Sequence, residues 1–219
     1  MTYKAVLFDM DGVIVDSLHY HFLAWQHKFR ELGGEVSEHS VLLHEGRNSR
    51  EILPLLLEET NTSLSEDSYE AFIEEKRNYY RSIVKIQHYE GAFDVVREVC
   101  KRGFRTALVT ASALRNMQNS IGEEERELFD FIITGDEIPR AKPNPDPYLT
   151  AMNHLGLSPE DCVVVENAPL GIQSAKNAGM FCVAVETTLG EEYLTGADVI
   201  VRKLTEILDL EQLKNTKSL

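Results

Sequence analysis

The chain has 219 residues, 43% of them hydrophobic and 26% charged, and its formal net charge at pH 7 is -14. These values are typical of a soluble globular protein with one large domain, or one domain carrying an insertion. The negative charge argues against binding to nucleic acid or to an anionic membrane surface. We expect no signal peptide, no membrane span and a cytoplasmic location, with Cys100, Cys162 and Cys182 as reduced thiols.

The first apolar stretch, residues 5–8, predicts a short strand that is buried on both faces, and Asp9, Asp11 and Gly12 follow it directly. The carboxyl ends of strands are the ligand-binding edge of a parallel α/β sheet, and a carboxylate buried there must be paired or bound to a metal. Two acids without a nearby basic residue favour a divalent cation, and oxygen ligands suit Mg²⁺. The alternative is a strand followed by an ordinary polar turn.

After Asp16 the pattern becomes helical. We expect helices over residues 18–32 and about 52–57, and a charged helix from about Ser65 to Ser82. No strand pattern appears between Asp16 and about His88. A segment of this length is too long for a loop, so residues 16–88 are predicted to form an inserted all-helical domain.

From Gly91 onward, strand and helix patterns alternate. The expected strands are 104–110, 131–134, 162–165, 181–185 and 198–201, and the expected helices are 92–102, 112–121, 146–155, 169–178 and 204–213. Ser112 and Asp146 are expected to cap their helices. The alternation predicts an α/β fold with a Rossmann-like parallel sheet and helices on both faces, formed by residues 1–15 and 89–219.

Polar residues follow several of these strands. They are Asp9 with Asp11, Thr110 with Ser112, Glu166 with Asn167, and Lys142 in a proline-rich segment. Because the strand ends of one parallel sheet lie along one edge, these side chains are expected to converge. Together they offer a nucleophile, metal ligands, a cation and an acid, which is the set that phosphoryl transfer needs.

Four ordered motifs, DxDGVxxDS, a strand ending in Thr, KPxPxPY and VVxEN, resemble the haloacid dehalogenase superfamily. The helical insertion after the first motif resembles the cap of its phosphatase and β-phosphoglucomutase branch. The resemblance implies that Asp9 is the nucleophile and forms an aspartyl-phosphate, and that Asp11 protonates the leaving oxygen and then activates water. It also implies that Thr110, Ala111 and Lys142 bind the phosphoryl group.

The resemblance further implies Mg²⁺ on the Asp9 carboxylate, the Asp11 backbone carbonyl and the last motif. Most family members have two acids in that motif, whereas this chain has Glu166 and Asn167. Asn167 offers a carbonyl oxygen without a charge, which should weaken Mg²⁺ binding unless another ligand compensates. Glu166 is expected either to be a ligand or to hold Lys142 or a metal-bound water.

The loop around Glu45 and Arg47 is a candidate source of that compensation. Glu45 is expected to complete the Mg²⁺ shell and Arg47 to pair with a distal phosphate, which would favour a compact substrate. The ENAPLG form of the last motif resembles pyrophosphatase members of the branch. The alternative is that Glu45 is solvated and the substrate is a larger phosphomonoester.

The first functional hypothesis is therefore a Mg²⁺-dependent phosphohydrolase acting on a small soluble phosphate, with inorganic pyrophosphate as a candidate. The second is a β-phosphoglucomutase, and the third is a non-catalytic phosphate-binding protein on the same fold. The expected partner is a small-molecule phosphate, with no nucleic acid and no membrane, and the chain is expected to be a monomer.

Overall fold

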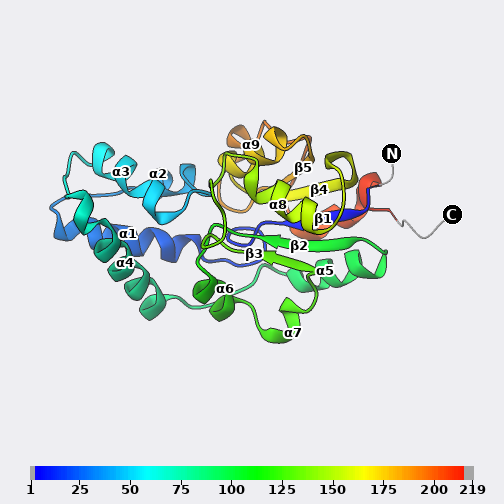
Figure 1. Ribbon diagram of the computed structural model, residues 1–219, viewed down its shortest axis with the longest axis horizontal. Coiled ribbons are helices and arrows are strands. Elements are labelled where there is room, and N and C mark those ends of the chain that lie inside the picture. Colours follow the sequence, from blue (N-terminus) through cyan, green and yellow to red (C-terminus); the bar gives the residue numbers. More distant parts are fainter. Residues whose placement is uncertain (1–2, 215–219) are drawn as a thin grey trace.

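The structure is a computed structural model that describes residues 3–214, and a six-stranded parallel sheet in the order β3-β2-β1-β4-β5-β6 lies at its centre (Figure 1). The strands are β1 (Ala5–Phe8), β2 (Arg105–Val109), β3 (Phe131–Ile133), β4 (Cys162–Glu166), β5 (Phe181–Val185) and β6 (Val199–Val201). This sheet has the α/β, Rossmann-like class that the alternating pattern predicts.

Different helices cover the two faces of the sheet. Because successive strand residues point to opposite faces, Val6 and Phe8 pack into one apolar cluster with α5, and Ala5 and Leu7 pack into another with α8 and α9. The elements of this part are α5 (Ala92–Lys101), α6 (Leu114–Ser120), α7 (Glu123–Arg126), α8 (Asp146–His154), η2 (Pro159–Asp161), α9 (Pro169–Asn177), η3 (Glu191–Tyr193), η4 (Leu204–Asp209) and η5 (Glu211–Leu213).

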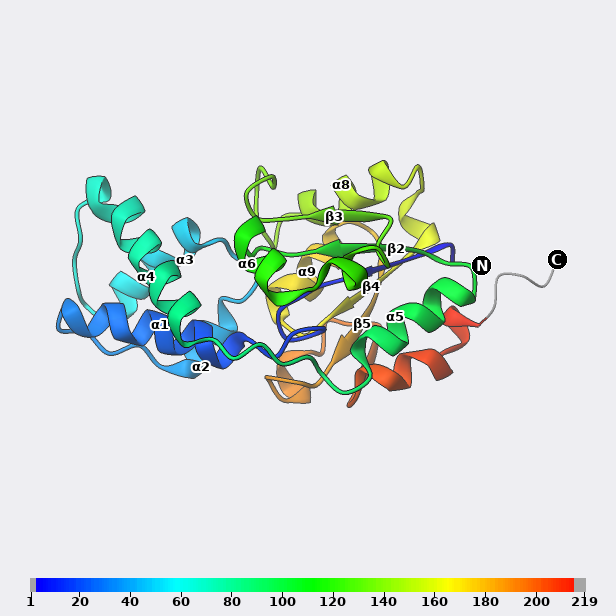
Figure 2. The same cartoon turned by 90° about the horizontal axis from the view of Figure 1, so that it is seen from below.

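Residues 18–83, all of them described, form helices and no strand, and are called the helical segment below. Its elements are α1 (Leu18–Glu31), α2 (Glu38–Leu43), α3 (Ser49–Glu59), η1 (Glu66–Ser68) and α4 (Tyr69–Ile83). Trp25, Phe29, Leu53 and Phe72 belong to an apolar cluster of this segment alone. Figures 1 and 2 show the segment beyond the carboxyl ends of the strands.

The two connections between the sheet and the helical segment lie side by side. The backbone N–H of Asp16 donates to the carbonyl of Gln87 at 2.9 Å, and the N–H of Tyr89 donates to the carbonyl of Ile14 at 3.0 Å. Both connections therefore cross next to the turn that follows β1.

The register of the sheet brings the polar strand ends together. Phe8, the last residue of β1, pairs with Leu108 of β2 on one side and with Val165 of β4 on the other. The residues that follow these three strands are consequently neighbours at one edge. No helix within residues 3–214 is long and apolar enough to cross a membrane.

Several local predictions are wrong. Ser112 does not cap α6, which begins at Leu114 after Ala113, because the Ser112 hydroxyl donates to Asp11 instead. Asp146 is the first residue of α8, not its cap. The expected final helix over 204–213 is two short 3-10 helices, and the brief helices α2 and α7 were not predicted because neither spans two full turns.

Candidate active site

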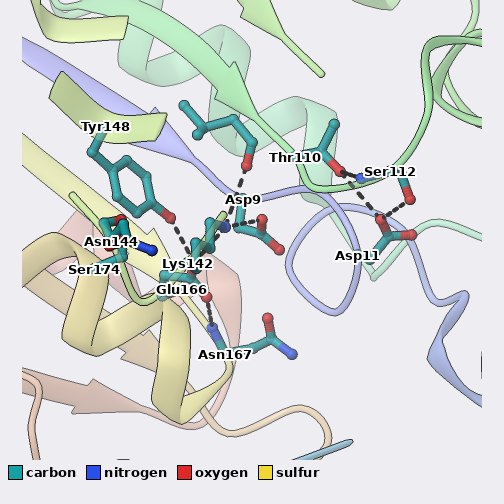
Figure 3. Close-up of polar contacts among 11 residues, drawn as sticks. Asp9, Asp11, Thr110, Ser112, Lys142, Asn144, Tyr148, Glu166, Asn167 and Ser174 are labelled. Atoms are coloured by element: carbon teal, nitrogen blue, oxygen red, sulfur yellow. Dashed lines mark hydrogen bonds and ion pairs between the residues drawn. The ribbon is translucent and has the colours of Figure 1, made fainter. Parts of the chain in front are cut away.

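A buried network of ion pairs lies at the sheet edge and consists of Asp9, Lys142 and Glu166. Lys142 Nζ lies 2.5 Å from Asp9 Oδ1 and 2.7 Å from Glu166 Oε1 (Figure 3). The three residues are only 4%, 1% and 1% exposed. Since a buried charge is costly unless it is paired, the lysine between two carboxylates holds the Asp9 side chain in one orientation.

Glu166 is fixed by contacts to both of its carboxylate oxygens. Tyr148 donates its hydroxyl to Oε1 at 2.5 Å, and the backbone N–H of Asn167 donates to Oε2 at 3.0 Å. Gly171 of α9 leaves the space for this carboxylate, because a Cβ there would lie 1.9 Å from Oε1. These contacts direct Glu166 toward Lys142, which is one of the two roles that the sequence leaves open.

Burial and neighbouring charges have opposite effects on the pKa values of Asp9 and Lys142. Burial raises the pKa of Asp9 to about 8, although Lys142 acts to lower it. Burial acts to lower the pKa of Lys142, but Asp9 and Glu166 outweigh that effect, so its pKa is raised and the ammonium stays charged. A divalent cation beside Asp9 would favour the ionised carboxylate.

Asp11 lies in a separate cluster of hydroxyl groups. Ser17 and Ser112 donate to its carboxylate, the latter at 2.8 Å, and Thr110 donates at 3.3 Å. His21 Nε2 lies 3.8 Å from Asp11 Oδ1, which is within ion-pair range but too far for a hydrogen bond. Burial acts to raise the pKa of Asp11, but the imidazole and the hydroxyls outweigh it, and this pKa lies below its usual value.

The loop after β2 contains Thr110 and Ala111. The backbone N–H of Ser112 donates to Thr110 Oγ1 at 3.0 Å, which tightens the loop. Gly135 packs directly against it, because a Cβ there would lie 2.1 Å from the Ala111 carbonyl oxygen. The loop thus places a hydroxyl and a compact turn beside Asp11.

His21 and Lys76 are two residues of the site that sequence reasoning missed. Lys76 Nζ lies 3.0 Å from His21 Nδ1 and 4.8 Å from the centroid of the Trp25 ring. Lys76 is only 3% exposed, and burial lowers its pKa to about 7. Burial and the charge of Lys76 also lower the pKa of His21. The available signal was that Lys76 occupies the buried face of α4, where a lysine is unusual.

A small pocket lies between the helical segment and the loop after β2, and its cavity volume is about 50 Å³. Its lining includes one acidic and three basic side chains, Glu45, Arg47, Lys76 and Arg77, together with Asn116. Arg47 Nε is buried and has no hydrogen-bond partner within residues 3–214. In a protein with a net charge of -14, this excess of basic side chains marks the pocket as a place for a small anion.

Glu45 lies half-buried in this pocket, near the carboxylates of Asp11 and Asp9. Burial, and then repulsion from Asp11 and Asp9, raise the pKa of Glu45 well above its usual value. Gly46 has a φ of 98° and brings the loop against the sheet domain, since a Cβ there would lie 3.1 Å from Lys142 side-chain carbons. The tertiary fold therefore brings Glu45 to the same edge as the strand-end acids.

The oxygen atoms at this edge fit a divalent cation. Asn167 is 0% exposed, and its Oδ1 is buried with no hydrogen-bond partner in the described chain. Figure 3 shows the Asn167 side chain extending from the end of β4 toward the space beside Asp9. No group of three or more His, Cys, Asp or Glu side chains within residues 3–214 could hold a metal. The fit therefore depends on the amide oxygen of Asn167 together with Asp9.

Comparisons with known proteins agree with this fold and site. Residues 6–185 match the family model of haloacid dehalogenase-like hydrolases, and the chain belongs to that family. It is 30% identical, over 94% of its length and 96% of the relative, to validoxylamine A 7'-phosphate phosphatase of Streptomyces hygroscopicus subsp. limoneus. It is 32% identical to β-phosphoglucomutase of Bacillus subtilis, over 93% and 91% of the two chains.

A crystal structure of β-phosphoglucomutase from Clostridium difficile is also similar. It superimposes with a TM-score of 0.84 at 29% identity, covering 94% of this chain and 93% of that chain. The fold, the polar strand ends and these relatives define the chain as a hydrolase of the phosphatase class within this family.

Proposed function

We propose that this phosphatase is a Mg²⁺-dependent phosphohydrolase that acts through an aspartyl-phosphate at Asp9 on a small phosphate compound. The observation that carries the proposal is the 2.5 Å pairing of Asp9 with Lys142, beside an Asp11 that is held separately by hydroxyl groups. A carboxylate next to an ammonium can receive a phosphoryl group, and a second carboxylate can handle the proton of the leaving group.

The reaction has two steps. In the first, an Asp9 oxygen bonds to phosphorus, the bond from phosphorus to the leaving oxygen breaks, and that oxygen takes a proton from Asp11. Because the pKa of Asp11 lies below its usual value in the free protein, Asp11 would take up this proton when the anionic substrate binds beside it. In the second, Asp11 accepts a proton from water, the water oxygen bonds to phosphorus, and the bond to Asp9 breaks to release phosphate. Lys142, Thr110 and the Ala111 backbone would bind the phosphoryl oxygens throughout.

Asp9, the carbonyl of Asp11 and Asn167 would hold Mg²⁺, and Glu45 would approach it from the helical segment. When bound, the cation supplies positive charge between the carboxylates and the phosphoryl group. Glu166 would act through Lys142, because both of its oxygens already accept hydrogen bonds. The supporting feature for the metal is the buried Oδ1 of Asn167, which has no hydrogen-bond partner among the described residues.

We assign residues 16–88 as a cap and residues 1–15 and 89–219 as the catalytic core. The supporting features are the separate apolar cluster of the helical segment and the adjacent crossings at Asp16 and Tyr89. A cap that approaches the sheet edge would exclude water from the aspartyl-phosphate and bring Glu45 and Arg47 to the substrate.

Inorganic pyrophosphate is the substrate that the pocket favours. The pocket has only about 50 Å³ of room, and Arg47, Lys76 and Arg77 line it. A leaving group that fits such a space must be small, and one that is itself a phosphate would pair with these basic side chains. The Nε of Arg47, which is buried and has no partner in the described part of the chain, is the donor most in need of such a partner.

The alternative is a β-phosphoglucomutase, which the basic pocket lining also supports, because a mutase must hold a second phosphate in the cap. A non-catalytic role is disfavoured by the joint presence of Asp9, Asp11 and Lys142. The deciding experiment measures phosphate release from pyrophosphate, phosphoglycolate and hexose phosphates, with and without Mg²⁺, and glucose 6-phosphate formation from β-glucose 1-phosphate. Release of phosphate from pyrophosphate that depends on Mg²⁺ supports the proposal, whereas isomerisation without release overturns it in favour of the mutase.

A further inference from the structure

Thr188 contacts the side-chain amide of Asn167. This asparagine is in the last motif, at the position where most members of the family have an acid. Asn167 Nδ2 donates to Thr188 Oγ1 at 3.1 Å, whereas Asn167 Oδ1 has no hydrogen-bond partner within residues 3–214. Thr188 follows β5 and is separated from Asn167 by 21 positions, so the sheet brings the two side chains together.

The carboxamide of Asn167 is also closely packed against the turn after β1. A Cβ at Gly12 would lie 2.1 Å from Asn167 Nδ2, so the glycine of the first motif leaves the space that the amide fills. Thr187, the neighbour of Thr188, donates to the carbonyl of Gly12 at 2.6 Å. The loop after β5 therefore holds both the turn after β1 and the amide that packs on it.

An amide differs from a carboxylate in having one acceptor end and one donor end. A carboxylate can present either oxygen to a cation, but an amide can do so only with its oxygen, and a rotated amide would direct an NH₂ group at the cation. When Oδ1 faces the cation, the NH₂ group on the same carbon points elsewhere within the protein and needs an acceptor, because Asn167 is 0% exposed. Thr188 Oγ1 is the acceptor at that position.

We propose that Thr188 is a positioning residue, which keeps the oxygen end of Asn167 toward the divalent cation by accepting a hydrogen bond from its nitrogen end. The inference rests on the metal site of the proposed function and explains how a neutral amide can serve where an acid is usual. Replacing the hydroxyl by a methyl group would leave a buried N–H without a partner whenever the oxygen binds the cation. Losing a group that orients a metal ligand typically weakens metal binding by about 10- to 100-fold.

The test measures metal affinity directly, without substrate. Mn²⁺ is titrated into the protein, free Mn²⁺ is followed by electron paramagnetic resonance, and Mg²⁺ affinity is obtained by competition. Thr188→Val, which keeps the shape of the side chain, is expected to weaken binding by about 10- to 100-fold. Thr188→Ser, which keeps the hydroxyl, is expected to stay within about threefold of the wild type. Equal affinities of the wild type and Thr188→Val would overturn the proposal.

The comparison with and without Thr188→Val is repeated in a protein that carries Asn167→Asp. It distinguishes a loss of amide orientation from general damage to the loop. With two equivalent oxygens at position 167, the Thr188→Val change should cost less than about threefold, and thermal unfolding should stay close to that of the parent. A loss as large as in the Asn167 protein would mean that Thr188 supports the loop rather than the amide, and would also overturn the proposal. Failure of the wild type to bind Mn²⁺ or Mg²⁺ would instead overturn the metal site of the proposed function itself.

Discussion

Lys76 Nζ lies 3.0 Å from His21 Nδ1. The ammonium faces this imidazole and the rings of Trp25 and Tyr80, at 4.8 and 5.8 Å from their centroids. A lysine that donates to Nδ1 leaves the imidazole proton on Nε2, the nitrogen that faces Asp11. The pair therefore extends from the pocket to the carboxylate that is proposed to move protons, and its burial has a measurable consequence for stability.

Lys76 should make the stability of the protein depend on pH. Burial lowers its pKa to about 7 in the folded chain, against about 10.4 in the unfolded chain. Between these values the unfolded chain binds more protons, so the stability of the wild type relative to Lys76→Met should rise with pH, by about 1.4 kcal/mol per unit around pH 8–10. Below about pH 6 the difference should be constant, since both states are then protonated.

Denaturant unfolding of the wild type and Lys76→Met at several pH values measures this slope. Lys28→Met is the matched control, because Lys28 is also buried but pairs with Glu31 and Glu75, which raise its pKa against the opposing effect of burial. The contribution of Lys28 should stay constant up to the unfolded-state pKa and be lost only above it. A flat difference between the wild type and Lys76→Met from pH 7 to 10 would contradict the prediction.

Asp9→Asn should abolish phosphate release, because an amide keeps the shape of the carboxylate but is not a nucleophile. The fold should persist, since Lys142 keeps its partner Glu166 at 2.7 Å. Circular dichroism and thermal unfolding check the fold, and a phosphate-release assay checks the activity. A clean Asp9→Asn sample that turns over at the wild-type rate would refute the nucleophile assignment.

Asp11→Asn should lower turnover of an alkyl phosphate by about 10²- to 10⁴-fold, the usual contribution of a general acid or base. The loss should shrink for an aryl phosphate, because a good leaving group needs no proton. Ser112→Ala, which removes one hydrogen bond to Asp11, should have a smaller effect on the same substrates. Because the second step is the same for both substrates, the comparison uses the burst of leaving-group release, which reports the first step alone. An equal loss of that burst on alkyl and aryl phosphates would argue against the acid role of Asp11.

Glu45→Ala should raise the Mg²⁺ concentration that gives half-maximal activity. Burial and the charges of Asp11 and Asp9 raise the pKa of Glu45, and a cation shared with those carboxylates would relieve that repulsion. Glu58→Ala is the control, because Glu58 is an exposed acid of the same helical segment. If both variants need the same Mg²⁺ as the wild type, Glu45 is an ordinary pocket-lining acid.

Arg47→Met should raise KM for pyrophosphate more than KM for a phosphomonoester with an uncharged leaving group. The buried Nε of Arg47 has no partner in the described chain and lies at the pocket, whereas Arg50, in the neighbouring turn, is exposed and pairs with Glu70. Arg50→Met is therefore the matched control and should change neither constant by more than about threefold, since an exposed ion pair contributes little. Equal KM changes for both substrates in Arg47→Met would remove the argument for an anionic leaving group.

The sequence by itself determined that the chain forms a parallel sheet. It also determined the succession of strands and helices along the chain and the residues that follow the strands. Short apolar stretches such as 5–8 and 162–165, alternating with helical patterns, are typical of central parallel strands, and the groups that follow such strands share one edge. That reasoning predicted, without coordinates, that Asp9, Thr110 and Asn167 follow neighbouring strands at this edge. It was less reliable for caps and brief helices, such as those near Ser112, where one side-chain contact decides the boundary.

The tertiary structure decided which polar groups pair, both at the edge of the sheet and in the helical segment beside it. Lys76 and His21 are 55 positions apart and Asn167 and Thr188 are 21 apart, so no local pattern connects them. Their contacts depend on how two helices cross and how a loop returns to the sheet, and on the cost of leaving a buried polar group unpaired. For the same reason, only the fold could separate the hydrogen-bonded nitrogen of Asn167 from its oxygen, which has no hydrogen-bond partner within residues 3–214.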